Sequence, residues 1–374
     1  MSSLRTIPLR LRSPAWASRA YSIKVEEEPD YYQPGGFHRV HLSDTYNSGQ
    51  STILRKLGYG QYSTVWLARD SVHKKYVALK ILRADSYSDS DSSKDIFESE
   101  ILSKASEIFS QSSHRGSHHV SHRLDQFTHT GPIGDHVCFA FDVLGYHLGF
   151  QTVQFLDGRL PVRAVKVIAR QLLLALDFLH EEVGVIHTDL KPTNILLEQQ
   201  DPEETIQNYQ SDVPVRTSTD PQSSGNAIPL REAITTPLIR YPSSSNRLRR
   251  RTHNLSESGL IQPPALRATE VTIGAPWNTC VSWSLGCILV ELVQGFVLFS
   301  GEASQHGTWT AEGDRLARII EVLSAFPRDF IKTGKRARYF FDEEGTLHRI
   351  PCLKPTSLER LLNGKTKRFL GQLM

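Results

Sequence analysis

Residues 51 to 82 alternate between hydrophobic and polar positions and predict three short strands. β-Branched or aromatic residues recur in the segments STILRKL (51–57), YSTVWLAR (62–69) and YVALKIL (76–82), with polar or glycine-rich stretches between them. Residues 136 to 144, HVCFAFDVL, are a further apolar run and predict a buried strand. This part of the chain therefore favours an antiparallel sheet.

Elsewhere the hydrophobic residues repeat at the three- and four-residue spacing of amphipathic helices. A long helix is predicted from Pro161, a residue favoured at the first helical position, to the region of Gly184. Further helices are predicted at residues 94–109, 284–295 and 314–326.

Residues 199 to 260 follow neither pattern. They are rich in Ser, Pro, Gln, Thr and Asn and have little periodicity, so the sequence predicts a mobile, low-complexity insertion. Their basic run, RLRRR at 247 to 251, is more often a solvated patch than a binding site.

The composition fits a globular protein of one large domain or two lobes. The chain has 374 residues, of which 39% are hydrophobic and 22% charged, and its net charge of +3 gives no argument for nucleic-acid binding. Its four cysteines lack a Cys-x-x-Cys spacing, so we expect reduced thiols rather than disulfides or a zinc site. No apolar run approaches the roughly 20 residues of a membrane span, and no membrane association is expected.

The first 25 residues contain five basic side chains and no acidic one. This composition fits either a mitochondrial transit peptide or a disordered basic tail. Pro8 and Pro14 weaken a continuous amphipathic helix, and both interpretations stay open.

The segment VIHTDLKPTN (185–194) carries the clearest chemical signal, because it places three polar side chains between two apolar runs. Asp189 can accept a proton from a hydroxyl nucleophile or orient it, and Lys191 can neutralise charge on a transferred phosphoryl group. Asn194 offers an amide oxygen to a metal ion. The pattern H-x-D-x-K-x-x-N matches a kinase catalytic loop in its residues and spacing.

A glycine-rich turn precedes this loop in the sequence. Gly58 and Gly60 in LGYGQYSTV lie between two predicted strands, where a backbone without side chains can approach a phosphate. Ser63 occupies the position where a third glycine is expected. The glycines alone fit a phosphate-binding loop and a tight hairpin turn equally well.

Lys80 lies inside a predicted apolar strand and shares a face with Ala78 and Leu82. A lysine there is costly to desolvate unless an anion meets it, so it either reaches the edge of the sheet or pairs with a carboxylate and a phosphate. The helix predicted after it offers Glu98 and Glu100 as carboxylate partners.

Taken together, these segments resemble a eukaryotic protein kinase, and specifically a fungal-type member of the SR-protein (serine/arginine-rich-protein) kinase family. The likeness rests on LGYGQYSTVWLARD, YVALKIL, HVCFAFDVLGYHL, LPVRAVKVIARQLLLALDFLH and VIHTDLKPTNILL in this order, on Thr188 in HTDLKP, and on GGFHRVHLSD upstream. It covers about residues 30–200 and 262–362.

The resemblance implies an α+β, two-lobed kinase fold with an antiparallel-sheet N-lobe, a mainly helical C-lobe and a disordered insertion. The division that it suggests is a tail at 1–29, an N-lobe at 30–145, a first C-lobe part at 146–198, the insertion at 199–260 and an incomplete second C-lobe part at 261–374. It further implies a monomer that transfers phosphate from ATP, with Mg²⁺, to Ser or Thr of Arg/Ser-rich proteins such as splicing factors. A cytoplasmic or nuclear location is expected, with a mitochondrial one as the alternative.

The family pattern also assigns roles to individual residues. Asp189 and Lys191 would be catalytic, and Asn194 would bind the metal. Glu100 would pair with Lys80, with Glu98 as the fallback. Phe141 would be the gatekeeper and residues 142–144 the hinge. The residues expected to contact ATP are Leu57, Gly58, Gly60, Val65, Ala78, Lys80, Glu100, Phe141 and Leu144.

Three departures from the family pattern concern catalysis. No Asp-Phe-Gly or Asp-Leu-Gly motif follows NILL, so the aspartate expected to hold the metal is missing. The segment TCVSWSLGC is one residue short, and the region of Ser282 replaces the aspartate that would brace the catalytic loop. The chain ends at Met374, before the helices that would supply an arginine to Glu270. A degenerate, non-catalytic kinase and a coding segment skipped in the gene sequence are both open explanations.

Overall fold

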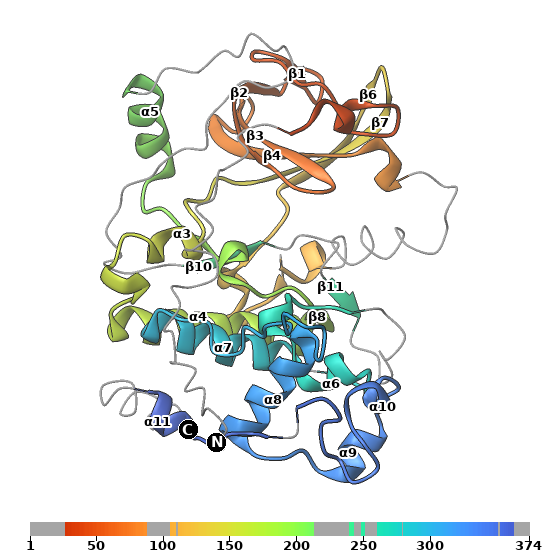
Figure 1. Ribbon diagram of the computed structural model, residues 1–374. Coiled ribbons are helices and arrows are strands. Elements are labelled where there is room, and N and C mark those ends of the chain that lie inside the picture. The colour runs from red at the N-terminus through yellow and green to blue at the C-terminus, as the bar shows by residue number, and fades with distance from the viewer. Residues whose placement is uncertain are drawn as a thin grey trace.

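The computed structural model describes residues 27–87, 105–109, 111–212, 239–242, 248–250, 260–278, 280–350 and 352–362. The chain forms two lobes, with a β-sheet at the top of Figure 1 and a mainly helical body below it. The expected α+β, two-lobed architecture with an antiparallel N-lobe sheet is confirmed.

Six strands form the N-lobe sheet in the order β1-β2-β3-β4-β7-β6, with every neighbouring pair antiparallel. Their bounds are β1 (Thr45–Tyr46), β2 (Ser51–Tyr59), β3 (Ser63–Asp70), β4 (Lys75–Leu82), β6 (Asp125–Gly131) and β7 (Gly134–Asp142). The four strands predicted from the sequence are confirmed as β2, β3, β4 and β7.

The two faces of this sheet have different surroundings. In β4, Leu79 and Ile81 are buried on the outer face in one cluster with Trp66 of β3. Ala78 and Lys80, which alternate with them, are half-buried on the opposite face. Strand periodicity therefore directs the lysine away from the apolar core of the lobe.

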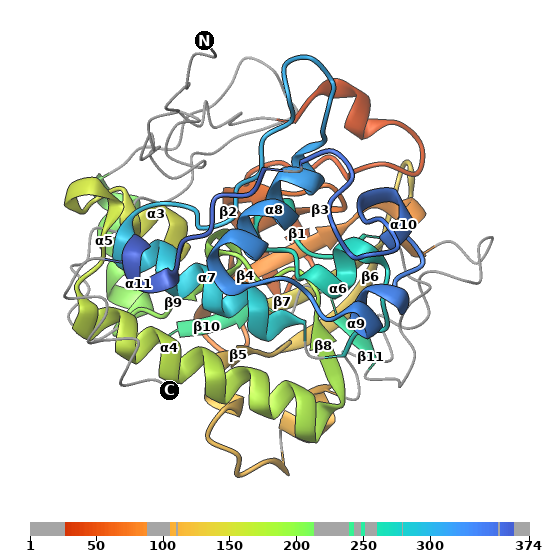
Figure 2. The same cartoon turned by 60° about the horizontal axis from the view of Figure 1, so that its bottom comes forward.

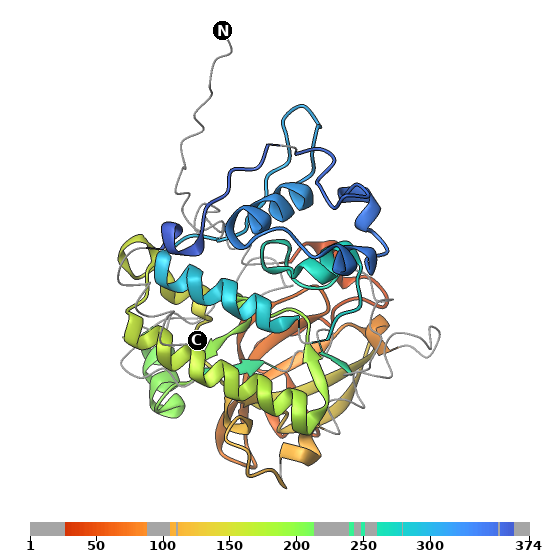
Figure 3. The same cartoon turned by 90° about the horizontal axis from the view of Figure 1, so that it is seen from below.

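Helices make up most of the C-lobe. Their bounds are α3 (Leu148–Thr152), α4 (Val162–Phe178), α6 (Thr269–Ile273), α7 (Val281–Gln294), α8 (Ala311–Leu323), α9 (Arg328–Lys332), α10 (Ala337–Phe340) and α11 (Leu358–Leu361). The long helices α4 and α7 lie side by side (Figure 3) and bury their apolar residues in the largest hydrophobic core. Gly184 and Gly295 end these segments in the left-handed conformation that glycine adopts most easily.

The predicted helices agree with this description apart from their ends. The helix expected from Pro161 is α4, continued by a π-helical turn at Leu179–Val183. The other two C-lobe predictions correspond to α7 and α8, and α8 ends at Leu323 rather than at residue 326. Of the helix predicted at 94–109, only residues 105–109 are described, and they are helical.

The segment predicted as an insertion contains three elements that sequence reasoning missed. Helix α5 (Pro202–Asp212) lies beside the N-lobe sheet in Figure 1. Strand β10 (Ile239–Pro242) pairs with β9 (Leu196–Leu197) and β5 (Val120–Ser121), and β11 (Leu248–Arg250) pairs with β8 (Val185–His187). Figure 2 shows β10 and β11 beside these partners in the C-lobe.

Two composition-based expectations concern the described residues. The four cysteines are free thiols, three of them buried and Cys352 exposed. None of the helices in the described ranges has the length and apolar character needed to cross a bilayer.

Candidate active site

The predicted glycine loop is the turn between β2 and β3. Gly58 lies opposite Val65 in the register, and the Gly60 amide donates a hydrogen bond of 2.8 Å to the Ser63 carbonyl, which closes the turn. A Cβ added at Gly58 or Gly60 would meet no atom within 4 Å. The turn is therefore a hairpin, and its glycines leave open space of the kind that a phosphate group needs.

Lys80 is held at the centre of the sheet. It lies opposite Val65 of β3 on one side and opposite Phe139 of β7 on the other. Its neighbour on the same face, Ala78, lies opposite Phe141. The glycine turn, the lysine and the predicted gatekeeper are thus fixed relative to one another by paired strands. The proposed carboxylate partners, Glu98 and Glu100, lie outside the described residues.

Residues 142–144 connect the two lobes as the predicted hinge. Lys75 at the start of β4 forms an ion pair of 3.3 Å with Asp142. After the hinge, the Gly145 amide donates to the Leu197 carbonyl at 2.8 Å, and the Leu197 amide donates to Tyr146 at 3.1 Å. These bonds attach the hinge to β9, the strand that follows the catalytic loop. Leu144 is half-buried at this junction.

The three polar residues of the predicted catalytic loop meet. Asp189 and Lys191 form an ion pair with Oδ2 and Nζ 3.2 Å apart, and the carboxylate is only 18% exposed. The Asn194 side-chain amide donates to the Asp189 carboxylate at 2.9 Å and to its carbonyl at 2.8 Å. Burial lowers the pKa of Lys191. This arrangement presents a carboxylate beside an ammonium, as proton acceptance and phosphoryl transfer require.

The backbone of the loop is braced by a residue that sequence reasoning missed. Gln262 donates from its backbone amide to the Thr188 carbonyl at 3.0 Å. Its side-chain amide donates to the Cys280 carbonyl and the Ser284 hydroxyl, both at 2.9 Å. Gln262 is buried and has a φ of 66°, whereas Ser282 is exposed. The sequence offers only a polar residue before two prolines as a signal, and these partners of Gln262 lie 18 to 74 positions away in the chain.

The chain is similar to known protein kinases over most of its length. Residues 51–207 match the protein kinase domain. An alignment of 353 positions shows 30% identity to serine/threonine-protein kinase SRPK of Physarum polycephalum, covering 88% of this chain and 80% of that protein. Identity to protein kinase dsk1 of Schizosaccharomyces pombe is 29% over 432 positions, covering 91% and 78%. Identity to serine/threonine-protein kinase SKY1 of Saccharomyces cerevisiae is 38% over 182 positions, covering 49% and 24%.

The chain belongs to the SR-protein kinase family. The resemblance noted in the sequence is thereby confirmed, and the kinase-domain match includes the glycine turn, Lys80, the hinge and the catalytic loop. A protein kinase domain in general uses ATP and a divalent metal ion.

The metal-binding side of this SR-protein kinase family member lacks the expected carboxylate. Strands β10 and β11 pair with β9 and β8, the strands that flank the catalytic loop. Residues 243–247, which connect β10 to β11 in the sequence, lie outside the described residues. These residues are Ser-Ser-Ser-Asn-Arg. In the described ranges, no three His, Cys, Asp or Glu side chains gather in a way that could hold a metal ion. Hard cations such as Mg²⁺ prefer carboxylate oxygens, and the residues present do not fit the usual kinase magnesium site.

A second departure concerns Glu270 on α6. Its carboxyl is half-buried, and burial raises its pKa. No ion pair joins Glu270 to a basic residue within the described part of the chain. The neighbouring Arg267 instead pairs with Glu312 of α8 at 3.1 Å, and Arg336 pairs with the same carboxylate at 2.9 Å. Glu312 of α8 therefore connects the segment before α6 to the segment before α10.

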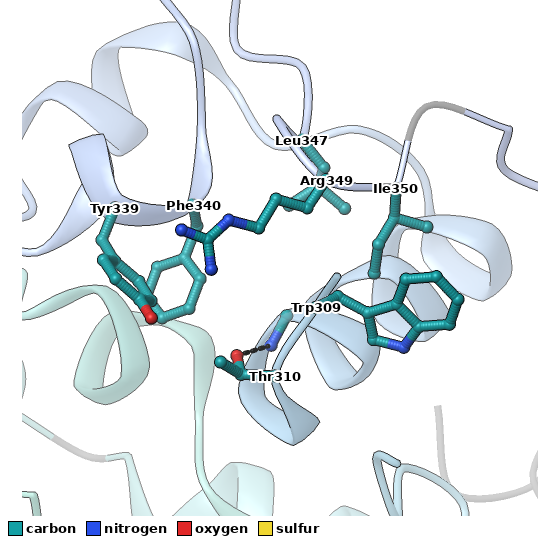
Figure 4. Close-up of a pocket in the computed structure, with 8 residues that line it drawn as sticks. Trp309, Thr310, Tyr339, Phe340, Leu347, Arg349 and Ile350 are labelled. Carbon is teal, nitrogen blue, oxygen red and sulfur yellow. Dashed lines mark hydrogen bonds between the residues drawn. The ribbon is translucent and has the colours of Figure 1, made fainter. Parts of the chain in front are cut away.

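One surface pocket lies in the C-lobe, at the start of α8 and at α10, and is lined by Trp309 and Thr310 before α8, by residues of those helices and by the 347–350 segment (Figure 4). The Arg349 guanidinium lies 5.1 Å from the Tyr339 ring centroid, and the Thr310 hydroxyl accepts a hydrogen bond from Gly313. Its volume of about 10 Å³ has room for no more than a water molecule. This pocket is too small to hold a nucleotide.

Proposed function

We propose that this chain is an ATP-dependent serine/threonine protein kinase that phosphorylates Arg/Ser-rich protein segments. The observation that carries the proposal is the contact of Asp189 with Lys191 and Asn194 directly after β8. The side chains of Asp189 and Lys191 are only 18% and 32% exposed. A turn with no function would not need to hold a carboxylate, an ammonium and an amide together in this way.

On this proposal the N-lobe binds the nucleotide. The backbone at Gly58 and Gly60, which has open space where side chains would stand, covers the phosphates, and Lys80 meets them with its ammonium. The apolar residues proposed to enclose the adenine are Leu57, Val65, Ala78, Phe141 and Leu144. The positions of these residues support this role, because Val65 and Ala78 lie on the same face of the sheet as Lys80, and Phe141 lies opposite Ala78.

The catalytic loop then acts on the acceptor hydroxyl. Asp189 takes up the hydroxyl proton as the serine oxygen attacks the terminal phosphorus, the bond from that phosphorus to the bridging oxygen breaks, and ADP leaves. Lys191 neutralises charge on the transferred phosphoryl group, and the two hydrogen bonds from Asn194 fix the orientation of the carboxylate. We propose Arg/Ser-rich substrates because of the family membership. In such a substrate the acceptor serine has arginines beside it.

A second function, a nucleotide-binding scaffold with impaired transfer, is favoured by the missing carboxylate between β10 and β11. Loss of the metal ligand removes charge neutralisation at the reacting phosphate, which is worth several kcal/mol. In that case the N-lobe would keep its affinity for nucleotide, while the catalytic loop would retain its geometry without turnover.

A transfer assay with radiolabelled ATP and an Arg-Ser repeat peptide distinguishes the two functions. For the kinase, the Asp189→Ala variant should lose about 10²- to 10⁴-fold of the wild-type rate, the usual contribution of a general base. Asp329→Ala, at a carboxylate that is 96% exposed, should leave the rate unchanged. Equal incorporation by the wild type and Asp189→Ala, with nucleotide binding retained in both, would establish the scaffold instead.

A further inference from the structure

The outer face of the N-lobe sheet holds a buried ion pair next to the glycine turn. The Lys56 ammonium of β2 contacts the Glu27 carboxylate, and the two side chains are 2% and 1% exposed. Tyr32 donates a hydrogen bond of 2.5 Å to the other oxygen of Glu27. Burying two charges is costly unless they pair well. A buried ion pair at this place therefore suggests a role for it.

Lys56 also contacts the glycine turn itself. Its ammonium lies 5.7 Å from the ring centroid of Tyr59, the residue between Gly58 and Gly60, and 5.4 Å from that of Trp66. The register places these side chains on one face, because Lys56 lies opposite Trp66 and Tyr59 lies opposite Thr64. Gly58 and Val65 belong to the other face. The ammonium therefore attracts an aromatic ring of the turn from the side away from the proposed nucleotide.

Strand β2 is irregular at this point. The register shifts between Ile53 and Arg55 and again between Lys56 and Gly58, which leaves Leu54 and Leu57 as extra residues. A bulge disrupts the ladder locally and redirects the strand. Side-chain contacts can then add to the backbone pairing where the strand enters the glycine turn.

The segment that supplies Glu27 is itself anchored. The Gly35 amide donates to the Ile133 carbonyl at 3.2 Å, and the amides of Ala84 and Asp85 donate to Gly36 and Gly35 at 3.1 and 2.8 Å. Phe37 is 1% exposed and stacks on Tyr31 with ring centroids 5.1 Å apart. Residues 27–37, here called the N-terminal strap, thus reach the sheet at two places.

We propose that the N-terminal strap positions the glycine turn, with Glu27 and Lys56 as positioning residues that act through Tyr59. The inference rests on the proposed function, in which the turn covers the nucleotide phosphates. Glu27 fixes the Lys56 ammonium, the ammonium holds the Tyr59 ring on the outer face, and the backbone from Gly58 to Gly60 consequently keeps its position. A segment that precedes the strands of the N-lobe sheet thereby sets the nucleotide affinity.

Hydrogen–deuterium exchange on the full chain tests the proposal without nucleotide. Glu27→Gln keeps the shape of the side chain but removes its charge, and the amides of residues 57–62 should exchange about tenfold faster or more, since a buried lysine then lacks its counter-ion. Glu28→Gln, at the exposed neighbouring position, is the matched control and should leave these amides unchanged.

Because Glu27→Gln can also unfold the lobe, a second variant separates positioning from stability. Glu27→Leu with Lys56→Met replaces the pair by apolar groups of similar size, a change that often preserves stability. The proposal predicts a wild-type melting temperature and wild-type protection of β3 and β4, with exchange at 57–62 still raised. Wild-type exchange at 57–62 in this double variant would overturn it.

A fluorescent ATP analogue gives the second readout. Both Glu27→Gln and the double variant should bind it about 3- to 10-fold more weakly than the wild type, in proportion to the loss of a cation–π contact. If the wild type binds no nucleotide, the proposed function fails, and the exchange data still decide whether the strap orders the turn.

Discussion

The N-lobe residues proposed to bind the nucleotide, here called the nucleotide side, keep the expected side chains. The segment expected to bind the metal ion, here called the metal side, lacks its carboxylate. On the nucleotide side, β4 presents Lys80 between two neighbouring strands, beneath a turn with open space at both glycines. On the metal side, β10 and β11 pair with the strands around the catalytic loop, but the residues between them contain no carboxylate. Backbone pairing needs only amide and carbonyl groups, whereas metal binding needs particular side chains. Strand topology can therefore persist where the chemistry is absent.

The length of the paired strands also differs between the two sides. Strands β3 and β4 pair along eight residues each, from Ser63 opposite Leu82 to Asp70 opposite Lys75. Strand β10 has four residues and β11 has three. A one-residue shift in the long pairing would move Lys80 to the buried outer face. Its position is thus determined by a long pairing, whereas β10 and β11 are short strands.

The largest effect expected on the nucleotide side is that of removing its lysine. Lys80→Ala should lower the transfer rate about 10²- to 10³-fold, the usual loss when one preorganised donor to a reacting group is removed. Affinity for a fluorescent ATP analogue should fall in parallel. Lys332→Ala, on an exposed side chain of α9, serves as the control. An unchanged nucleotide affinity in Lys80→Ala would show that this lysine does not bind the nucleotide, and the two sides would then not differ in the way described.

A smaller effect is expected at α5, which connects the two sides by following β9 and packing on the sheet. Ile206 is fully buried with Leu67, Val143 and the half-buried Leu57. Ile206→Ala should destabilise the protein by about 2 to 3 kcal/mol through lost burial and the resulting cavity. Asn208→Ala, on the exposed face of α5, should change stability by less than about 0.5 kcal/mol. Urea unfolding measures both, and equal values for the two variants would show that α5 does not stabilise the N-lobe.

The sequence revealed those parts of the site that depend on short-range patterns. Strand alternation places Lys80 with Ala78, and the spacing of Asp189 and Asn194 is complete within one loop. It could not reveal α5, whose mean composition is polar and whose two buried residues, Ile206 and Tyr209, are defined only by the sheet that they contact. Gln262 was missed for the same reason.

The strands β10 and β11 show a further limit of sequence patterns. Their residues lack strand periodicity, and only the partner strands β9 and β8 define them. A search for the Asp-Phe-Gly motif can report its absence. It cannot report that the flanking strands are nevertheless formed, because that information lies in pairings between residues about 40 to 65 positions apart.

Restoring a carboxylate to the metal side should have an intermediate effect. An aspartate introduced in turn at each position from 243 to 247 should, at one position, raise the transfer rate about tenfold. That gain is part of the several kcal/mol that a correctly held metal ion supplies. The matched asparagine variants carry no charge and should give no gain, and the increase should depend on the Mg²⁺ concentration. If no aspartate position raises the rate, the missing carboxylate is not what distinguishes the two sides.

The smallest expected effect concerns the pH range over which the nucleotide side stays folded. His38 is 7% exposed, and its ring centroid lies 4.6 Å from that of His129 and 4.9 Å from that of His136. Burial, followed by the charges of these two histidines, lowers the pKa of His38 to about 4, although the nearby Asp44 opposes the shift.

The sign of the pH effect follows from the depressed pKa of this histidine. Because the folded-state pKa lies below the unfolded value of about 6.5, the unfolded chain binds the proton first as the pH falls. The stabilisation by neutral His38 is present above pH 6.5 and is lost between about pH 6.5 and 4. The wild type should lose about 1 kcal/mol more than His38→Phe between pH 7 and pH 5, as measured by urea unfolding. The exposed His306→Phe should keep the wild-type dependence. If His38→Phe also keeps it, the histidine cluster does not control the acid stability of the N-lobe.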